Sequence, residues 1–166
     1  MRSRTWVPCA ITLSFALGMI LQSARGSGGE KDETRVTGVG GFFFKAQDPK
    51  KLGDWYREHL DIALEPAGKG EHAPQYHPFQ WRDKGHPDTV GATILPIFPA
   101  DTKYFAPSNA PFMINFRVAN LERLLGQLRK EGVKVDDKID DEDNGRFSWA
   151  MDPEGNRIEL WEPKGE

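Results

Sequence analysis

The amino-acid sequence contains two copies of the same pattern, and each copy spans roughly half of the folded part. Asp48 and Asn120 each follow an extended, partly apolar stretch and are residue types that favour the N-cap of a helix. Asp48 and Asn120 lie 72 positions apart. Leu52 and Leu124, in the helices that would follow these caps, have the same spacing. The same spacing separates two further pairs, Gly41 and Met113, and Tyr56 and Leu128. Such a repeat predicts two half-domains whose strands join into one curved sheet, with helices on one face and a cleft on the other.

The order within each copy is a strand, a helix and three strands. Apolar alternation and turn residues predict strands at 36–46, 62–64, 79–82, 89–95, 112–118 and 133–139, followed by a closing hairpin over 148–161. Helices are expected after Asp48, where Pro49 suits the first helical position, and after Asn120, with Gly132 ending the second. Residues 65–78 are expected to be a loop, 140–145 an acidic turn, and the proline-rich stretch 96–111 a connector.

The closing hairpin carries the residue of most functional interest. Asp152 and Asn156 flank a Pro-Glu-Gly loop, which is typical of a tight turn. That register pairs Trp149 with Glu159, whose carboxylate would then share a face with Trp149, opposite the apolar residues of the strand. Burying a carboxylate without a partner is costly, so this face is where a functional site is expected.

The first residues have the features of an export signal. Arg2 and Arg4 precede an apolar run at 11–21 and small residues near 24–26. The run is shorter than the roughly 20 residues of a membrane span. We therefore expect a signal peptide at 1–26, a linker at 27–35, one domain at 36–164, and a secreted or periplasmic location. An uncleaved anchor or a wrongly assigned start codon is the alternative.

Composition excludes several classes of protein. The single cysteine, Cys9, lies inside the predicted signal peptide, so a processed chain would have no disulfide, cysteine nucleophile or thiolate metal ligand. Cleavage removes three arginines and no acidic residue, which takes the net charge from −3 to −6. An acidic domain argues against nucleic acid as a partner.

Three stretches together resemble a known superfamily. The turn and strand from Asp152 to Leu160 read Asp-Pro-Glu-Gly-Asn-Arg-Ile-Glu-Leu, and Trp55–Leu60 and Asn115–Val118 add support. With the paired modules, they resemble the vicinal oxygen chelate superfamily, which includes glyoxalases, extradiol dioxygenases, epimerases and bleomycin-resistance proteins. The resemblance implies an α+β fold in which two βαβββ modules form one curved mixed sheet with helices on its convex face.

The resemblance also implies a divalent metal in the cleft, held by one residue from the first and last strand of each half. The four corresponding positions here are Gly41, Thr93, Met113 and Glu159, of which only Glu159 is a suitable hard ligand. We therefore predict that the cleft has no metal and no other cofactor. The alternative is one divalent metal bound by Glu159 and a residue outside this alignment, such as His77.

Without a metal, Glu159 needs another role. An ion pair with Arg117 or Lys45 is the favoured interpretation, and a general base or a direct ligand contact are the others. The residues predicted to face the cleft and bind a ligand are Lys45, Phe43, Asn115, Arg117, Trp149, Met151 and Trp161. For the aromatic members, ordinary sheet packing is an equally good explanation.

Other candidates carry less weight. His72, His77 and His86 lie near Asp83 but lack the fixed spacing of a zinc site, so they are interpreted as loop residues. Tyr104, in the connector, could touch a ligand, although a simple crossover is favoured.

The sequence leaves three functions open. The leading hypothesis is a glyoxalase-like protein that binds a small, partly apolar molecule in the concave sheet, with its catalytic status undecided. The second is a metal-dependent lyase or dioxygenase of the same superfamily. The third is a non-catalytic domain that dimerises through its open sheet.

Overall fold

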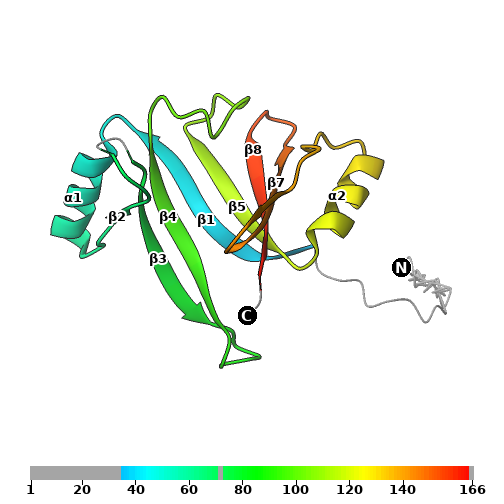
Figure 1. Cartoon of the computed structure of the whole chain (residues 1–166), viewed down its shortest axis with the longest axis horizontal. Helices are drawn as coiled ribbons and strands as arrows, with labels where there is room; N and C mark the ends of the chain where they lie inside the picture. The colour runs from blue at the N-terminus through cyan, green and yellow to red at the C-terminus, as the bar shows by residue number, and fades with distance from the viewer. Residues whose placement is uncertain (1–34, 71–72, 165–166) are drawn as a thin grey trace, which may run out of the picture. The chain divides into compact units, whose positions relative to one another are not determined.

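A computed structural model describes residues 35–70 and 73–164, all of which belong to one compact unit, 32–166. Its eight strands form one sheet in the order β2-β3-β4-β1-β5-β8-β7-β6, with α1 and α2 towards its two ends (Figure 1). The first half consists of β1 (Val36–Ala46), α1 (Pro49–Leu60), β2 (Glu65–Pro66), β3 (Gln75–Arg82) and β4 (Val90–Pro99). The second half consists of β5 (Phe112–Val118), α2 (Leu121–Lys130), β6 (Asp140–Glu142), β7 (Gly145–Met151) and β8 (Arg157–Pro163).

The two halves have the same topology. The first strand of each half runs parallel to the last strand of that half, so β1 pairs with β4 and β5 with β8. The two first strands, β1 and β5, pair antiparallel in the middle and join the halves. The structure therefore confirms the predicted α+β architecture of two βαβββ modules in one curved mixed sheet.

Both predicted helix starts are confirmed. The Asp48 side chain accepts a hydrogen bond from the backbone N–H of Lys51 at 2.9 Å, and Asn120 accepts one from Arg123 at 3.0 Å. These bonds satisfy N–H groups that the first turn of a helix otherwise leaves without a partner. After α2, Gly132 adopts a φ of 79°, a left-handed conformation that glycine reaches without steric cost.

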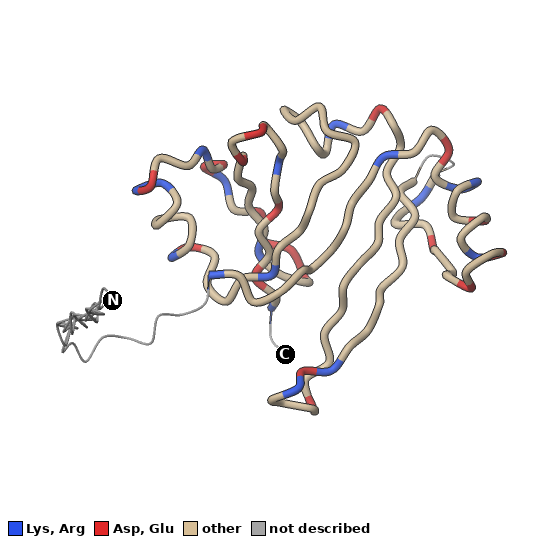
Figure 2. The backbone as a smooth tube through the Cα atoms, turned by 180° about the vertical axis from the view of Figure 1, so that it is seen from behind, with Lys and Arg blue, Asp and Glu red and all other residues tan. Residues whose placement is uncertain are grey.

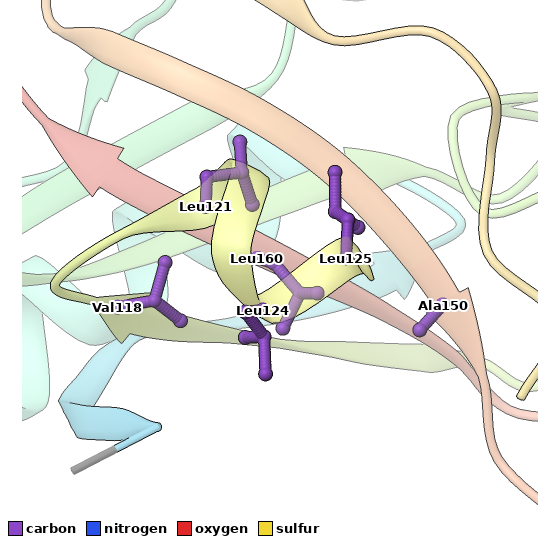
Figure 3. Close-up of a cluster of buried hydrophobic side chains, with 6 residues drawn as sticks. All are labelled: Val118, Leu121, Leu124, Leu125, Ala150 and Leu160. Atoms are coloured by element: carbon purple, nitrogen blue, oxygen red, sulfur yellow. The ribbon is translucent and has the colours of Figure 1, made fainter. Parts of the chain in front are cut away.

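Apolar side chains cluster on both faces of the second half. One cluster lies between α2 and the sheet and contains Val118, Leu121, Leu124, Leu125, Ala150 and Leu160 (Figure 3). The other, which we call the aromatic cluster, consists of Phe43, Phe105, Met113 and Trp149. Trp149 and Ala150 are neighbours in β7 and belong to different clusters, because successive side chains of a strand point to opposite faces. We call the face that α2 covers the convex face and the other the concave face.

The structure corrects several predicted boundaries. Residues 133–139 form no continuous strand and have one isolated bridge, Val135 to Ala150, while the expected acidic turn contains β6. Val133, Val135 and Ile139 instead pack against the α2 cluster, which explains their apolar pattern. The strand expected at 62–64 is replaced by β2, two residues long, and β3 and β4 extend beyond their predicted ends.

Charge is distributed away from the middle of the sheet. Lys and Arg alternate with Asp and Glu along the helices and loops, whereas β1, β3 and β4 carry few charged residues (Figure 2). No helix within residues 35–70 and 73–164 is long and apolar enough to cross a membrane. The predicted signal peptide, and all of the predicted linker except residue 35, lie outside the described residues.

Candidate functional site

The side chain of Glu159 lies on the concave face, in the middle of the second half. Its strand, β8, runs between β5 and β7, where Glu159 pairs with Asn115 on one side and Trp149 on the other. The next residue, Leu160, belongs to the cluster under α2, so Glu159 points to the opposite face. The side chain is 1% exposed, which is unusual for a carboxyl group in a sheet.

Neutral donors surround this carboxyl group. The Tyr104 hydroxyl donates a short hydrogen bond to Oε1, and Asn115 Nδ2 donates to Oε2 at 2.6 Å. The indole of Trp149 lies close enough to lower the pKa of the carboxyl, although its Nε1 makes no hydrogen bond of ordinary geometry. Asn115 Oδ1 is also buried without a partner. Buried polar atoms normally find partners, so these two atoms mark a polar centre with unused hydrogen-bonding capacity.

Burial controls the protonation of the pair formed by Glu159 and Tyr104. It raises the pKa of Glu159, and the hydrogen bonds from Tyr104 and Asn115 oppose that shift only partly. Burial, together with the charge of Glu159, also raises the pKa of Tyr104. Both shifts favour the neutral forms, so the centre of this site carries less charge than its residue types suggest.

The expected ion pair of Glu159 with Arg117 or Lys45 is wrong. Arg117 donates to the hydroxyl and the carbonyl of Thr37, at 3.1 and 3.2 Å, and its guanidinium lies 4.2 Å from the centre of the Trp81 ring. Lys45 Nζ lies 5.1 Å from the centre of the Phe105 ring. Both cations therefore rest on aromatic rings near the sheet, and neutral groups hold the carboxyl instead.

The connector after β4 packs onto the concave face. Its Phe105 side chain is 0% exposed within the aromatic cluster, and the Tyr104 ring stacks on Phe98 with 5.3 Å between centroids. Arg157 Nη1 donates to the carbonyls of Tyr104 and Ala106, at 2.8 and 2.7 Å. The favoured interpretation of this segment as a simple crossover missed these contacts. The sequence signal was present, since two adjacent aromatic residues in a polar, proline-rich connector need a surface on which to pack.

The remaining predicted ligand residues lie in three places. Phe43 and Trp149 belong to the aromatic cluster on the concave face. Trp161 stacks on Phe147, with 6.2 Å between centroids, and its Nε1 donates to the Asn144 carbonyl at 3.0 Å. Met151 lines an apolar groove beside α2, which is separate from the surroundings of Glu159.

The donor set does not fit the divalent metal that the resemblance implies. Gly41 has no side chain, the Thr93 hydroxyl donates to the Val39 carbonyl at 2.9 Å, and Met113 is a buried thioether. Both oxygens of Glu159 accept hydrogen bonds. In the described part of the chain, no three or more His, Cys, Asp or Glu residues are grouped in a way that could hold a metal.

The histidines lie apart from this centre. His77 Nδ1 is 2.7 Å from the Ala63 carbonyl, and the ring contacts Phe79 edge-on. His86 lies 3.6 Å from Asp83 on an exposed turn. His72 lies outside the described residues.

A cavity of about 280 Å³ lies beside Tyr104 and Trp149. It is lined by Tyr104, Asp140, Glu142, Asn144, Phe147 and Trp149. Two of these residues also surround Glu159, so the cavity adjoins the buried carboxyl through their rings. Its volume is slightly below the roughly 300 Å³ at which pockets for drug-sized molecules begin, so it suits a smaller ligand.

The paired modules and the carboxyl on the concave face define the class of fold as glyoxalase-like. The sequence model of the glyoxalase-like domain matches residues 41–161. The chain therefore belongs to the glyoxalase-like domain family, within the vicinal oxygen chelate superfamily.

Solved structures agree with this assignment of the fold. Methylmalonyl-CoA epimerase from Mycobacterium tuberculosis is 19% identical, with a TM-score of 0.54 over 78% of this chain and 90% of that chain. A single-residue variant of the Streptomyces coelicolor epimerase, in complex with 2-nitronate-propionyl-CoA, is 18% identical, with a TM-score of 0.58 over 78% and 99%. No curated protein matches the sequence. At these identities the structural likeness establishes the fold alone.

Proposed function

We propose that this glyoxalase-like domain binds a small, partly apolar molecule on its concave face, beside Glu159 and without a metal. The observation that carries the proposal is the buried carboxyl held by neutral donors next to an aromatic cavity. Small-molecule sites commonly combine apolar walls with a few polar groups that fix the orientation of the ligand. A methylmalonyl-CoA epimerase with the same fold binds 2-nitronate-propionyl-CoA, which supports a small-molecule ligand in general terms.

Glu159 is the buried carboxyl group that adjoins this cavity through Tyr104 and Trp149. Its raised pKa brings the carboxyl closer to the range in which a side chain exchanges protons near neutral pH. Tyr104 contacts both the carboxyl group and the cavity. A proton exchanged between Glu159 and a ligand would therefore pass through the Tyr104 hydroxyl, or Tyr104 would first have to move aside. In the cell, we expect the domain to act outside the cytoplasm, after removal of the predicted signal peptide.

Binding can be tested with a neutral aromatic dicarbonyl, 1-phenylpropane-1,2-dione. A ligand that binds the native state raises the melting temperature in proportion to the logarithm of its concentration. We expect such a rise for the chain from residue 27 onwards, and its loss in the Trp149→Leu variant. The matched control is Trp55→Leu, because Trp55 is exposed on α1 in the other half of the sheet.

A second readout separates loss of the site from loss of the fold. Circular dichroism should show that Trp149→Leu is folded, and Tyr104→Phe, which keeps the ring, should retain part of the thermal shift. If a broad set of neutral, cationic and anionic aromatic compounds leaves the melting temperature of the unmodified chain unchanged, the proposal is wrong.

A further inference from the structure

The cavity beside Glu159 combines aromatic rings with carboxylates. Asp140 of β6 pairs directly with Phe147 of β7, and directly paired residues of antiparallel strands share a face. Trp149, two residues along β7, lies on that face as well, and Tyr104 approaches it from the connector, with its ring edge-on to Trp149 at 6.0 Å between centroids. Glu142 completes the wall at the outer end of β6.

Aromatic rings together with carboxylates are the groups that bind organic cations in proteins. Aromatic faces attract a cation through the negative charge of their π-systems, and carboxylates add a direct electrostatic attraction. The Trp149 ring already accepts a cation, because the Arg157 guanidinium lies 4.5 Å from its centre. Asp140 and Glu142 place two carboxyl groups in the wall that Tyr104 and Trp149 share.

Arg157 and Lys138 are basic side chains that contact the wall of the cavity, and each has an acidic partner. Arg157 donates to Asp136 at 2.7 Å, so its charge is balanced by an acidic residue outside the cavity lining. Lys138 forms an ion pair with Asp140, but its side chain is 81% exposed. A salt bridge at the surface contributes little free energy, so a ligand cation can replace Lys138 at this carboxylate.

We infer that the molecule bound in this cavity is a small organic cation, an alkylated ammonium group attached to an apolar body. This inference rests on the proposed function and specifies its ligand class. Carboxyl groups in the wall also disfavour an anionic ligand in this cavity.

The test compares three probes of matched shape: benzyltrimethylammonium, its neutral isostere neopentylbenzene, and the anion phenylacetate. Tryptophan fluorescence and thermal shift are measured on the chain from residue 27 onwards. We expect the ammonium to bind roughly tenfold more tightly than the neutral isostere, and phenylacetate to bind least. Higher salt should weaken the ammonium alone, because its attraction to the carboxylates is screened.

Variants identify the site. Glu142→Gln combined with Asp140→Asn should remove most of the preference for the ammonium and leave neopentylbenzene unaffected. Asp143→Asn is the matched control, since Asp143 lies in the same hairpin but does not line the cavity. Equal binding of the ammonium and its isostere, or unchanged selectivity in the double variant, overturns the cation inference and leaves the proposed function standing. Failure of these probes together with the dicarbonyl compound counts against both.

Discussion

At the scale of single residues, the structure replaces an expected charge pair with a neutral network. Strand alternation predicted that the Glu159 carboxylate lies on the concave face. It also predicted that the side chains of Arg117 and Lys45 lie on that face, which made them the expected partners. It could not show that Tyr104 would reach Glu159 from 55 positions away. That contact depends on the path of an irregular connector, which local patterns do not encode. The orientation of Glu159, in contrast, followed from strand alternation and the turn before it.

The protonation of Glu159 predicts a pH-dependent gain in stability for Glu159→Gln. Because burial raises the folded-state pKa above the usual 4.5, the contribution of this group is fully present below about pH 4.5 and is lost as the pH rises through the folded pKa. The Gln amide oxygen can still accept from Tyr104, its NH2 group can donate to Asn115 Oδ1, which has no partner, and the amide never ionises. We therefore expect its melting temperature to exceed that of the unmodified chain at about pH 8 and to approach it at about pH 4.

Thermal unfolding across this range checks the prediction. Glu154→Gln serves as the control, because Glu154 is exposed in the turn before β8, and its melting temperature should follow that of the unmodified chain throughout. A Glu159→Gln variant that is less stable at pH 8 would mean that the ionised carboxyl contributes to the fold.

At the scale of elements, the bounds of strands and helices are predicted best where residues within a few positions determine them. The bounds of β1 and β5 and the starts of both helices agree with expectation, because alternation and N-cap residues are encoded within a few positions. The strand predicted at 133–139 was wrong. Its apolar residues pack against the cluster under α2, and the segment has one isolated bridge instead of a continuous set of strand hydrogen bonds. Prediction also failed at β3, where Pro78 lies within the strand although proline is generally disfavoured there.

The connector between β4 and β5 should contribute to stability as a core element. Phe105 is completely buried, so Phe105→Ala should lower the free energy of unfolding by about 3–5 kcal/mol. Phe79→Ala removes a ring that is 41% exposed on β3 and should cost much less. Urea denaturation of both variants measures the difference, and similar losses would show that the connector is only loosely attached to the sheet.

At the scale of the whole molecule, duplication explains why the fold could be predicted and the site could not. The 72-residue spacing places corresponding strands at corresponding positions, and this symmetry determines the sheet order. The positions that would hold a metal in the resembled superfamily carry different residues in the two halves, Gly41 and Thr93 in the first and Met113 and Glu159 in the second. What occupies the concave face therefore depends on differences between the halves, which the repeat does not predict.

The donor set predicts how the whole protein responds to metals. We expect the protein purified without chelators to contain substoichiometric divalent metal. EDTA should not lower its melting temperature, and added Zn²⁺, Mn²⁺ or Mg²⁺ should not raise it, since only a ligand bound to the native state stabilises it. Elemental analysis and thermal unfolding provide the measurements. One tightly bound ion per chain that is lost in Glu159→Ala would contradict this expectation and restore the metal-dependent alternative.

The contacts of Arg157 bear on how such a domain can change during evolution. This side chain fastens the connector, the segment before β6 and the Trp149 ring to one another. Replacing it would remove these contacts at once, while the buried Phe105 ring and the hydrogen bonds of the sheet remained in place. A substitution at this one position therefore alters the inner surface without changing how the strands of the repeated scaffold pair.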